Sequence, residues 1–111
     1  MRIGELARRT GVSVRALRFY EERGVLRPRR TANGYRDFAP EAVQTVAHVQ
    51  LLLAAGLKLE LIGQILACLT GPELLLDGCR ARLLVERRRM TEQQASLAAA
   101  QEILDGLLTN A

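Results

Sequence analysis

The sequence predicts a mainly α-helical protein with four short helices and a small β-hairpin, followed by one long C-terminal helix. Three observations lead to this prediction. Apolar residues recur at helical spacing through most of the 111 residues, without long strand-like alternation. One basic segment around Asn33-Gly34 interrupts this pattern and has the composition of a hairpin turn. The stretch from Cys79 to about Leu108 contains no Pro and a single Gly, which predicts one helix of about 30 residues.

The first two helices are separated by a glycine turn. Ile3 to Thr10 forms the first helix, and Gly11 begins the turn. Ser13 is a good N-cap for the second helix, because its hydroxyl can accept a hydrogen bond from a free backbone amide. This helix continues to about Arg23 and ends at Gly24. Two short helices joined in this way predict a helix-turn-helix.

Residues 27–38 predict a hairpin that faces an anion. Asn33-Gly34 favours a type I′ turn, in which both central residues have positive φ. The flanking residues include Arg29, Arg30 and Arg36, which cannot face an apolar core. We therefore expect a wing that lies on an anionic surface; an ordinary solvated hairpin is the alternative.

Two further helices complete a first domain over residues 1–70. Pro40 suits the first turn of the third helix, which runs to Ala55 and stops at Gly56. The fourth helix runs from about Leu59 to Leu69. The apolar residues that we expect in the core are Leu6, Leu17, Val25, Leu26 and Phe38, with Val43, Val46, Ala47 and Val49 of the third helix and Leu59, Ile62, Ile65, Leu66 and Leu69 of the fourth.

The long helix, over residues 79–109 after a linker at 71–78, has the pattern of a coiled coil. Apolar residues recur at every seventh position from 83 to 104, as in a two-helix seam. A helix this long cannot pack along its whole length on a domain this small. We therefore expect much of it to project and to pair with a second subunit. An intramolecular helical hairpin would need a break near Thr91, where there is no Gly or Pro. The predicted seam residues are Leu83, Met90, Leu97, Leu104 and Leu107.

Positive charge is concentrated near the N-terminus. Residues 1–40 carry ten Arg against four acidic residues, whereas residues 41–111 carry six basic against eight acidic residues. Arg side chains suit phosphate oxygens and guanine edges, so this asymmetry predicts a nucleic-acid partner. No apolar run approaches the roughly 20 residues that span a bilayer, and the first residues lack the apolar core of a signal peptide. We expect a cytoplasmic protein with no membrane partner.

The sequence offers little for catalysis. No segment gathers a nucleophile, a base and an orienting acid, and the single histidine, His48, has no evident partner. Cys68 and Cys79 are the only cysteines, and in a cytosolic protein we expect them to be reduced. We therefore predict that the chain is not an enzyme and has no resident cofactor.

Several blocks of the sequence, taken together and in order, resemble the MerR family of bacterial transcription regulators. The similarity is collinear over residues 1–70, and the length of the last helix agrees with it. The blocks are Ile3–Ala7, Thr10–Ser13, Val14–Glu21, Gly24–Leu26, Asn33–Arg36 and Leu59–Ile62.

The resemblance implies a winged helix-turn-helix protein that binds double-stranded promoter DNA as a homodimer. The second helix enters the major groove and the wing lies on the sugar–phosphate backbone. Two antiparallel terminal helices join the subunits, and the dimer bends and untwists a long promoter spacer so that RNA polymerase engages both elements. The implied DNA-contacting residues are Ser13, Val14, Arg15, Arg18 and Tyr20 around the second helix, and Arg30, Asn33, Tyr35 and Arg36 in the wing.

The chain departs from this family pattern at two places. Phe19 stands where many relatives have Tyr, so we do not expect a hydroxyl contact there and expect the ring to pack. Leu51, Leu53 and Leu61 stand where relatives often have charged residues. They either enlarge the surface that packs against the partner's long helix or only reflect a Leu-rich genome.

The signal that such a regulator receives is left open. Metal-sensing relatives place Cys or Ser at the start of the long helix, where Cys79 stands, but the Cys-rich loop that follows the helix is missing here. Cys68 and Cys79 are sensor candidates for a soft metal ion or a thiol redox signal, and buried structural cysteines are the alternative. Two other functions also remain: an architectural or excisionase-like DNA-binding protein without transcriptional output, and an adaptor that acts through its coiled coil.

Overall fold

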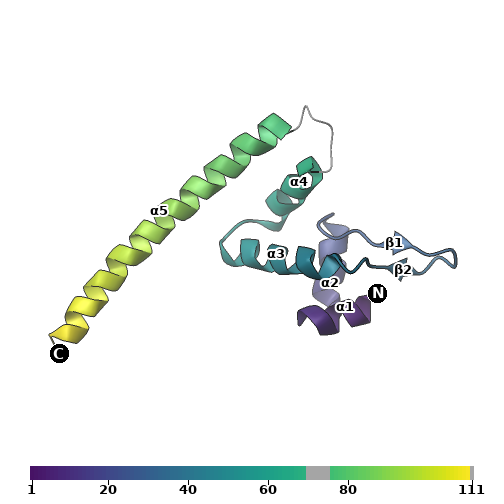
Figure 1. The fold of residues 1–111 in the computed structure, drawn as a ribbon, viewed down its shortest axis with the longest axis horizontal. Coiled ribbons are helices and arrows are strands. Elements are labelled where there is room, and N and C mark those ends of the chain that lie inside the picture. The colour runs from purple at the N-terminus through teal and green to yellow at the C-terminus, as the bar shows by residue number, and fades with distance from the viewer. Residues whose placement is uncertain (70–75, 111) are drawn as a thin grey trace. The chain divides into compact units, whose positions relative to one another are not determined.

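The protein is described by a computed structural model that covers residues 1–69 and 76–110. The chain divides into two compact units, residues 1–70 and residues 71–111, which are described separately (Figure 1). We call the first unit the head. The predicted fold class, mainly helical with one small hairpin and a long C-terminal helix, is confirmed.

The first two helices of the head begin and end where their capping residues predict. Helix α1 spans Ile3–Thr10, and Gly11 follows it in the left-handed region with φ 74°. Helix α2 spans Val14–Glu22. The Ser13 hydroxyl accepts a hydrogen bond of 3.1 Å from the Ala16 amide, which satisfies one of the free amides at the start of the helix.

The wing is a short antiparallel hairpin of β1 (Arg29–Arg30) and β2 (Arg36–Asp37), with Arg30 opposite Arg36. The predicted type I′ turn is wrong. Gly34 has φ 79°, and no non-glycine residue in the described part of the chain has positive φ, so Asn33 is not left-handed. The Thr31 amide donates to the Tyr35 carbonyl oxygen at 2.8 Å, which leaves a three-residue loop. A loop of this length requires only one left-handed residue, and glycine takes that position.

Helices α3 (Ala42–Ala54) and α4 (Leu59–Leu69) complete the head. Helix α3 begins two residues after Pro40 and is followed by Gly56 with φ 94°. Helix α4 approaches the end of α2 closely at Gly63. A Cβ atom there would lie 3.1 Å from the Arg23 carbonyl oxygen and 3.4 Å from Val25 Cγ1, so only glycine fits without a shift of backbone.

The core of the head is aliphatic, with one Phe at its centre. The predicted core residues Leu6, Leu17, Val25, Leu26 and Phe38 are all buried. Val46 and Val49 of α3 are buried as well, whereas Ala47 is exposed. Leu61 is also buried, which contradicts its expected place on an outer surface. The predicted buried stripe was thus too wide at Ala47 and too narrow at Leu61.

The second unit contains one helix, α5 (Leu76–Thr109), of 34 residues and hence about 51 Å in length. It begins three residues before the expected Cys79, so Gly78 lies inside its first turn. Glycine costs about 1 kcal/mol in a helix, which a helix of this length tolerates. No helix in the described residues is long and apolar enough to cross a bilayer.

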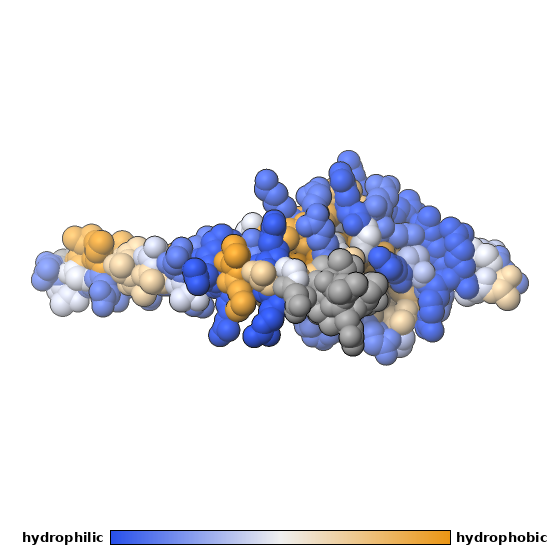
Figure 2. Space-filling view, turned by 90° about the horizontal axis from the view of Figure 1, so that it is seen from above, coloured by the Kyte–Doolittle hydropathy of each residue, from blue (hydrophilic) through white to orange (hydrophobic). Residues whose placement is uncertain are grey.

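Large apolar side chains lie open on α5. Figure 2 shows one group of them, in orange, at the C-terminal end of the helix, at the left of the view. The exposed fractions of these side chains run from 39% to 75%, and the residues are Leu83, Leu84, Val85, Leu97, Ile103, Leu104, Leu107 and Leu108. In the single chain, four of the five predicted seam residues are thus exposed, and Met90 is half-buried.

Candidate nucleic-acid interface

Helix α2 presents a basic outer face. Arg15, Arg18, Phe19 and Glu22 follow helical spacing and line a hollow of about 340 Å³ on the surface of the head. Leu17 on the opposite face is buried in the core, so the helix cannot rotate to hide its charged side. Arg15 and Arg18 are exposed, and among the described residues neither forms an ion pair. Both guanidinium groups therefore remain available to an anion.

The start of α2 is less open than this face. Ser13 is exposed, but its hydroxyl already serves as the N-cap. Val14 is half-buried. Their contacts with DNA stay predictions, and the free amides of the helix N-terminus are the groups best suited to meet a phosphate there.

The structure places Tyr20 in the core, whereas the sequence led us to expect a phosphate contact. Its exposed fraction is 6%, and its hydroxyl oxygen accepts a hydrogen bond from Gln50 of α3. The side chain thus links α2 to α3. Sequence periodicity could not reveal this, because Gln50 lies 30 residues away. We correct the role of Tyr20 to packing.

The wing brings Arg30, Asn33 and Tyr35 to the surface, and all three are exposed. The guanidinium of Arg2 lies 4.2 Å from the centroid of the Tyr35 ring, a favourable stacking distance for a cation on an aromatic face. Arg2 comes from the start of the chain and was not among the predicted contacts. It adds a positive charge to the wing and restrains the Tyr35 ring.

A partly buried ion pair joins the wing to α2. Arg36 Nη1 lies 3.2 Å from Glu21 Oε2, and the Glu21 side chain is only 19% exposed. About half of the Arg36 side chain stays exposed, so it remains accessible to a phosphate. The sequence predicted Arg36 at the interface but missed Glu21, since the pairing depends on how the hairpin folds back on the helix.

The base of the wing is held by the start of the chain. The Met1 ammonium donates to Asp37 Oδ1 at 2.8 Å and to the Phe38 carbonyl oxygen at 2.7 Å. The hydrogen bond from the Met1 ammonium to Asp37, with smaller contributions from the charges of Arg29 and Arg2, lowers the pKa of the Asp37 carboxyl below its usual value. Asp37 is therefore ionised at neutral pH, and the pairing persists until the pH falls through that lowered pKa.

Arg23, after the end of α2, connects α2 with α4. Its guanidinium lies 5.1 Å from the centroid of the Phe19 ring and its Nη1 lies 3.5 Å from Glu60 Oε1 on α4. Both ionic partners are largely exposed, so the pair contributes little to stability. Its effect is geometric, because it holds the cation beside Phe19.

The candidate sensor residues are only partly described. Cys79 is buried and disulfide-bonded, so the expectation of a reduced thiol is wrong for this residue. The redox state of a compartment predicts whether thiols are generally reduced. It does not predict whether a second sulfur lies within bonding distance of a given cysteine. The side chain of Cys68 lies outside the described residues. Within the described part of the chain, no three metal-ligating side chains come together.

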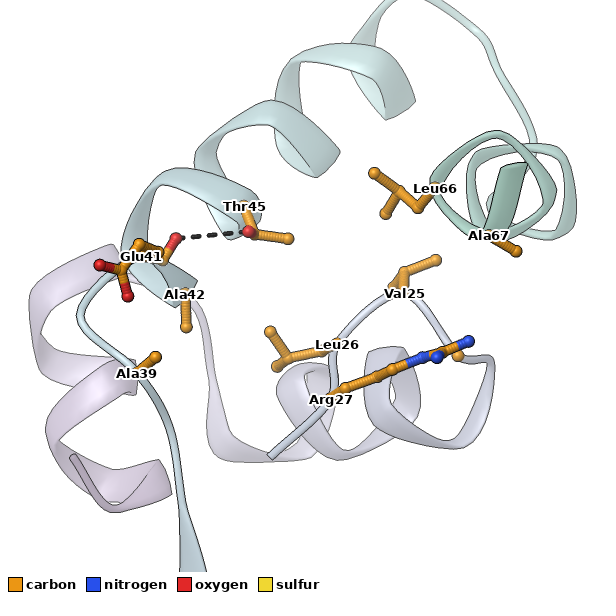
Figure 3. Close-up of a pocket in the computed structure, with 10 residues that line it drawn as sticks. Val25, Leu26, Arg27, Ala39, Glu41, Ala42, Thr45, Leu66 and Ala67 are labelled. Atoms are coloured by element: carbon orange, nitrogen blue, oxygen red, sulfur yellow. Dashed lines mark hydrogen bonds between the residues drawn. The ribbon is translucent and has the colours of Figure 1, made fainter. Parts of the chain in front are cut away.

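A cavity of about 410 Å³ lies between the loop that follows α2 and helices α3 and α4 (Figure 3). Val25, Leu26 and Leu66 line it with apolar surface. Arg27 and Glu41 are the charged residues in its lining. None of the nine predicted DNA-contacting residues lines this cavity.

Comparison with known proteins gives matches over the head and over nearly the whole chain. Residues 1–68 match the family described as MerR HTH family regulatory protein. The HTH-type transcriptional regulator HmrR of Rhizobium leguminosarum bv. viciae is 39% identical over 67 residues, or 60% of this chain and 52% of that protein. The chain thus aligns with about half the length of this relative.

Two solved structures share the fold. A MerR family transcriptional regulator from Listeria monocytogenes has a TM-score of 0.87 at 25% identity, over 99% of this chain and 84% of that one. HiNmlR, described as a MerR family regulator lacking the sensor domain and bound to promoter DNA, has a TM-score of 0.83 at 23% identity, over 97% of this chain and 86% of that one.

Proposed function

The chain belongs to the MerR HTH family of regulatory proteins, and we propose from this premise that it is a sequence-specific DNA-binding transcription regulator. It acts as a cytoplasmic homodimer on double-stranded promoter DNA and is not an enzyme. The observation that carries the proposal is the outer face of α2, where exposed Arg15 and Arg18 have no ionic partner among the described residues. Paired Arg side chains on a recognition helix read guanine edges and hold phosphates.

The wing supplies the backbone clamp. The hairpin carries four of the predicted DNA-contacting residues, which are Arg30, Asn33, Tyr35 and Arg36. Arg2 stacks on the Tyr35 ring. Phosphate contacts of this kind fix the position of a protein on the duplex but carry no sequence information. Base readout is therefore assigned to α2, and positioning to the wing.

The exposed apolar residues of α5 support a dimer. A 34-residue helix with this much apolar surface in the open requires a partner. The seam repeat is symmetric about the point between Gln93 and Gln94, so an antiparallel pair places Leu83 against the partner's Leu104 and Met90 against the partner's Leu97.

Charge favours the same antiparallel orientation. Residues 76–90 carry five Arg against two acidic residues, whereas residues 91–109 carry three acidic residues and no basic one. Antiparallel pairing sets the basic part of each helix beside the acidic part of the other. Parallel pairing would align like charges along the seam.

We further propose that the dimer distorts the promoter spacer and so affects RNA polymerase without a direct catalytic role. HiNmlR, which is bound to promoter DNA, has the same fold. The alternative is an architectural or excisionase-like protein that bends DNA without transcriptional output. Transcription in vitro from promoters with different spacer lengths, with and without the protein, separates the two. Only a regulator should change the transcript yield when it is added, by an amount that depends on spacer length.

The first test is footprinting on the DNA upstream of the chain's own gene. The Arg15→Ala and Arg18→Ala double variant should lose about 100-fold in affinity while α5 still dimerises. Lys58→Ala with Arg88→Ala removes the same charge outside the predicted interface and should lose only a fewfold. Equal losses in both variants would contradict readout by α2 and leave only general electrostatic binding.

The same footprint addresses the signal. It is repeated with reduced, oxidised and copper(I)-loaded protein, and with the Cys79→Ser variant. A thiol-based sensor predicts a response that Cys79→Ser abolishes. An unchanged response in that variant assigns Cys79 a structural role.

A further inference from the structure

Phe19 is the apolar residue in an otherwise charged face. Its exposed fraction is 43%, whereas its apolar helix neighbours Leu17 and Tyr20 are buried in the core. It shares the hollow of about 340 Å³ with Arg15, Arg18 and Glu22. The ring therefore lies partly open on the outer face of α2.

The ring is held in place. The Arg23 guanidinium lies 5.1 Å from its centroid, and Arg23 in turn is 3.5 Å from Glu60 of α4. A cation on one face of an aromatic ring restricts its rotation and leaves the edge and the other face to meet a partner. Phe19 is thus a restrained apolar contact that shares its hollow with two available cations, Arg15 and Arg18.

The chemistry of the hollow specifies what fits beside the ring. The two cations require an anionic partner, and the ring requires an apolar group that reaches it from the same partner. In a DNA major groove the exposed apolar group is the C5 methyl of thymine, which phenylalanine side chains contact. We propose that Phe19 is a specificity-determining residue that contacts the methyl group of one thymine in each half-site.

This inference depends on the proposed function, and its test separates the two. Duplexes bound by the full-length protein are first selected from a random-sequence library. In the tightest duplex each thymine is then replaced by deoxyuracil, which removes only the methyl group. Affinity is measured by fluorescence anisotropy for the wild type and for Phe19→Ala, Phe19→Leu and Leu51→Ala.

The wild type should lose about fourfold in affinity at one thymine of each half-site, the effect of one buried methyl group. Phe19→Ala should bind the thymine and deoxyuracil duplexes equally, whereas Phe19→Leu, still apolar, retains more than twofold discrimination. Leu51→Ala truncates an exposed apolar residue of α3, outside the α2 face. It should leave the ratio of affinities for the thymine and deoxyuracil duplexes unchanged, because any effect on dimerisation applies equally to both duplexes. Circular dichroism verifies that each variant is folded.

Two results would overturn the inference while leaving the proposed function intact. One is a wild type that binds every deoxyuracil duplex as tightly as the parent. The other is Phe19→Ala retaining the full discrimination of the wild type, which would assign the methyl contact to another residue. Failure to enrich any sequence from the library would overturn the proposed function and this inference with it.

Discussion

The head and helix α5 differ in where they bury their apolar side chains. In the head, six large apolar residues are 0–1% exposed, whereas large apolar residues of α5 are 39–75% exposed. The head therefore buries much of its apolar surface in its own core, whereas α5 leaves its large apolar residues exposed. These exposed residues are proposed to form the seam between two subunits, so helical apolar repeats would serve an internal core in the head and an intermolecular seam in α5.

The most direct way to break this comparison is to put charge in the seam. Leu97→Glu with Leu104→Glu should convert the dimer to a monomer and lower DNA affinity about 100-fold or more, because two linked reading surfaces bind far more tightly than one. Sedimentation and anisotropy titrations measure the two effects. Ala99→Glu, on the far side of the helix from Leu97, is the matched control and should remain dimeric. A dimeric double variant would show that the seam lies elsewhere.

Gly63→Ala tests the head alone. The added Cβ meets the Arg23 carbonyl oxygen at 3.1 Å, so this backbone must give by a few tenths of an ångström. We expect the strain to exceed the roughly 1 kcal/mol that Ala gains over Gly in a helix, so the head should lose about 1 kcal/mol of unfolding free energy. Gly4→Ala in α1 meets no atom within 4 Å and should be neutral or slightly stabilising. Denaturant unfolding compares the two. The comparison between head and α5 weakens if Gly63→Ala also changes the dimer dissociation constant.

Tyr20→Phe separates a core role from a DNA contact. Removing the hydroxyl that binds Gln50 should cost about 1 kcal/mol of stability without changing DNA affinity at a temperature where the head is folded. Thermal unfolding and anisotropy give the two quantities. A loss of affinity with unchanged stability would restore the phosphate contact that the sequence led us to expect.

Glu21→Gln has the smallest expected effect. It breaks the 3.2 Å pair with Arg36 and frees the wing, which positions α2 on the duplex. The preference for the selected duplex over an unrelated one should therefore fall about twofold to threefold. Glu5→Gln makes the same charge change in the exposed pair with Arg9 on α1. Competition binding that shows equal effects in both variants would indicate that charge alone, and not wing position, is responsible.

Local signals were sufficient for much of the head. Ser13, Gly11 and Gly56 act through their nearest neighbours, so the limits of α1 and α2 and the end of α3 followed from sequence. The hairpin was predicted, but its turn type was not. Asn33-Gly34 is compatible with more than one loop length, and only the hydrogen-bond register decides between them.

The features that were missed depend on residues distant in the chain. Gln50 explains why Tyr20 is buried, and Glu21 explains how Arg36 is held, but neither pairing has a sequence signature. The disulfide of Cys79 is similar, since it depends on a distance that composition cannot supply. In α5 the heptad repeat predicted the apolar positions along the helix. The second subunit that would cover these positions remains a proposal.

Two copies of the α2 face, one from each subunit, are proposed to read one duplex. The decisive measurement is the motif enriched from a random-sequence duplex library by the full-length protein, together with the mass of the complex. We predict an inverted repeat bound by two subunits, lost in the Arg15→Ala and Arg18→Ala variant. Enrichment of a single unrepeated site bound by one subunit, or of no sequence at all, would contradict it.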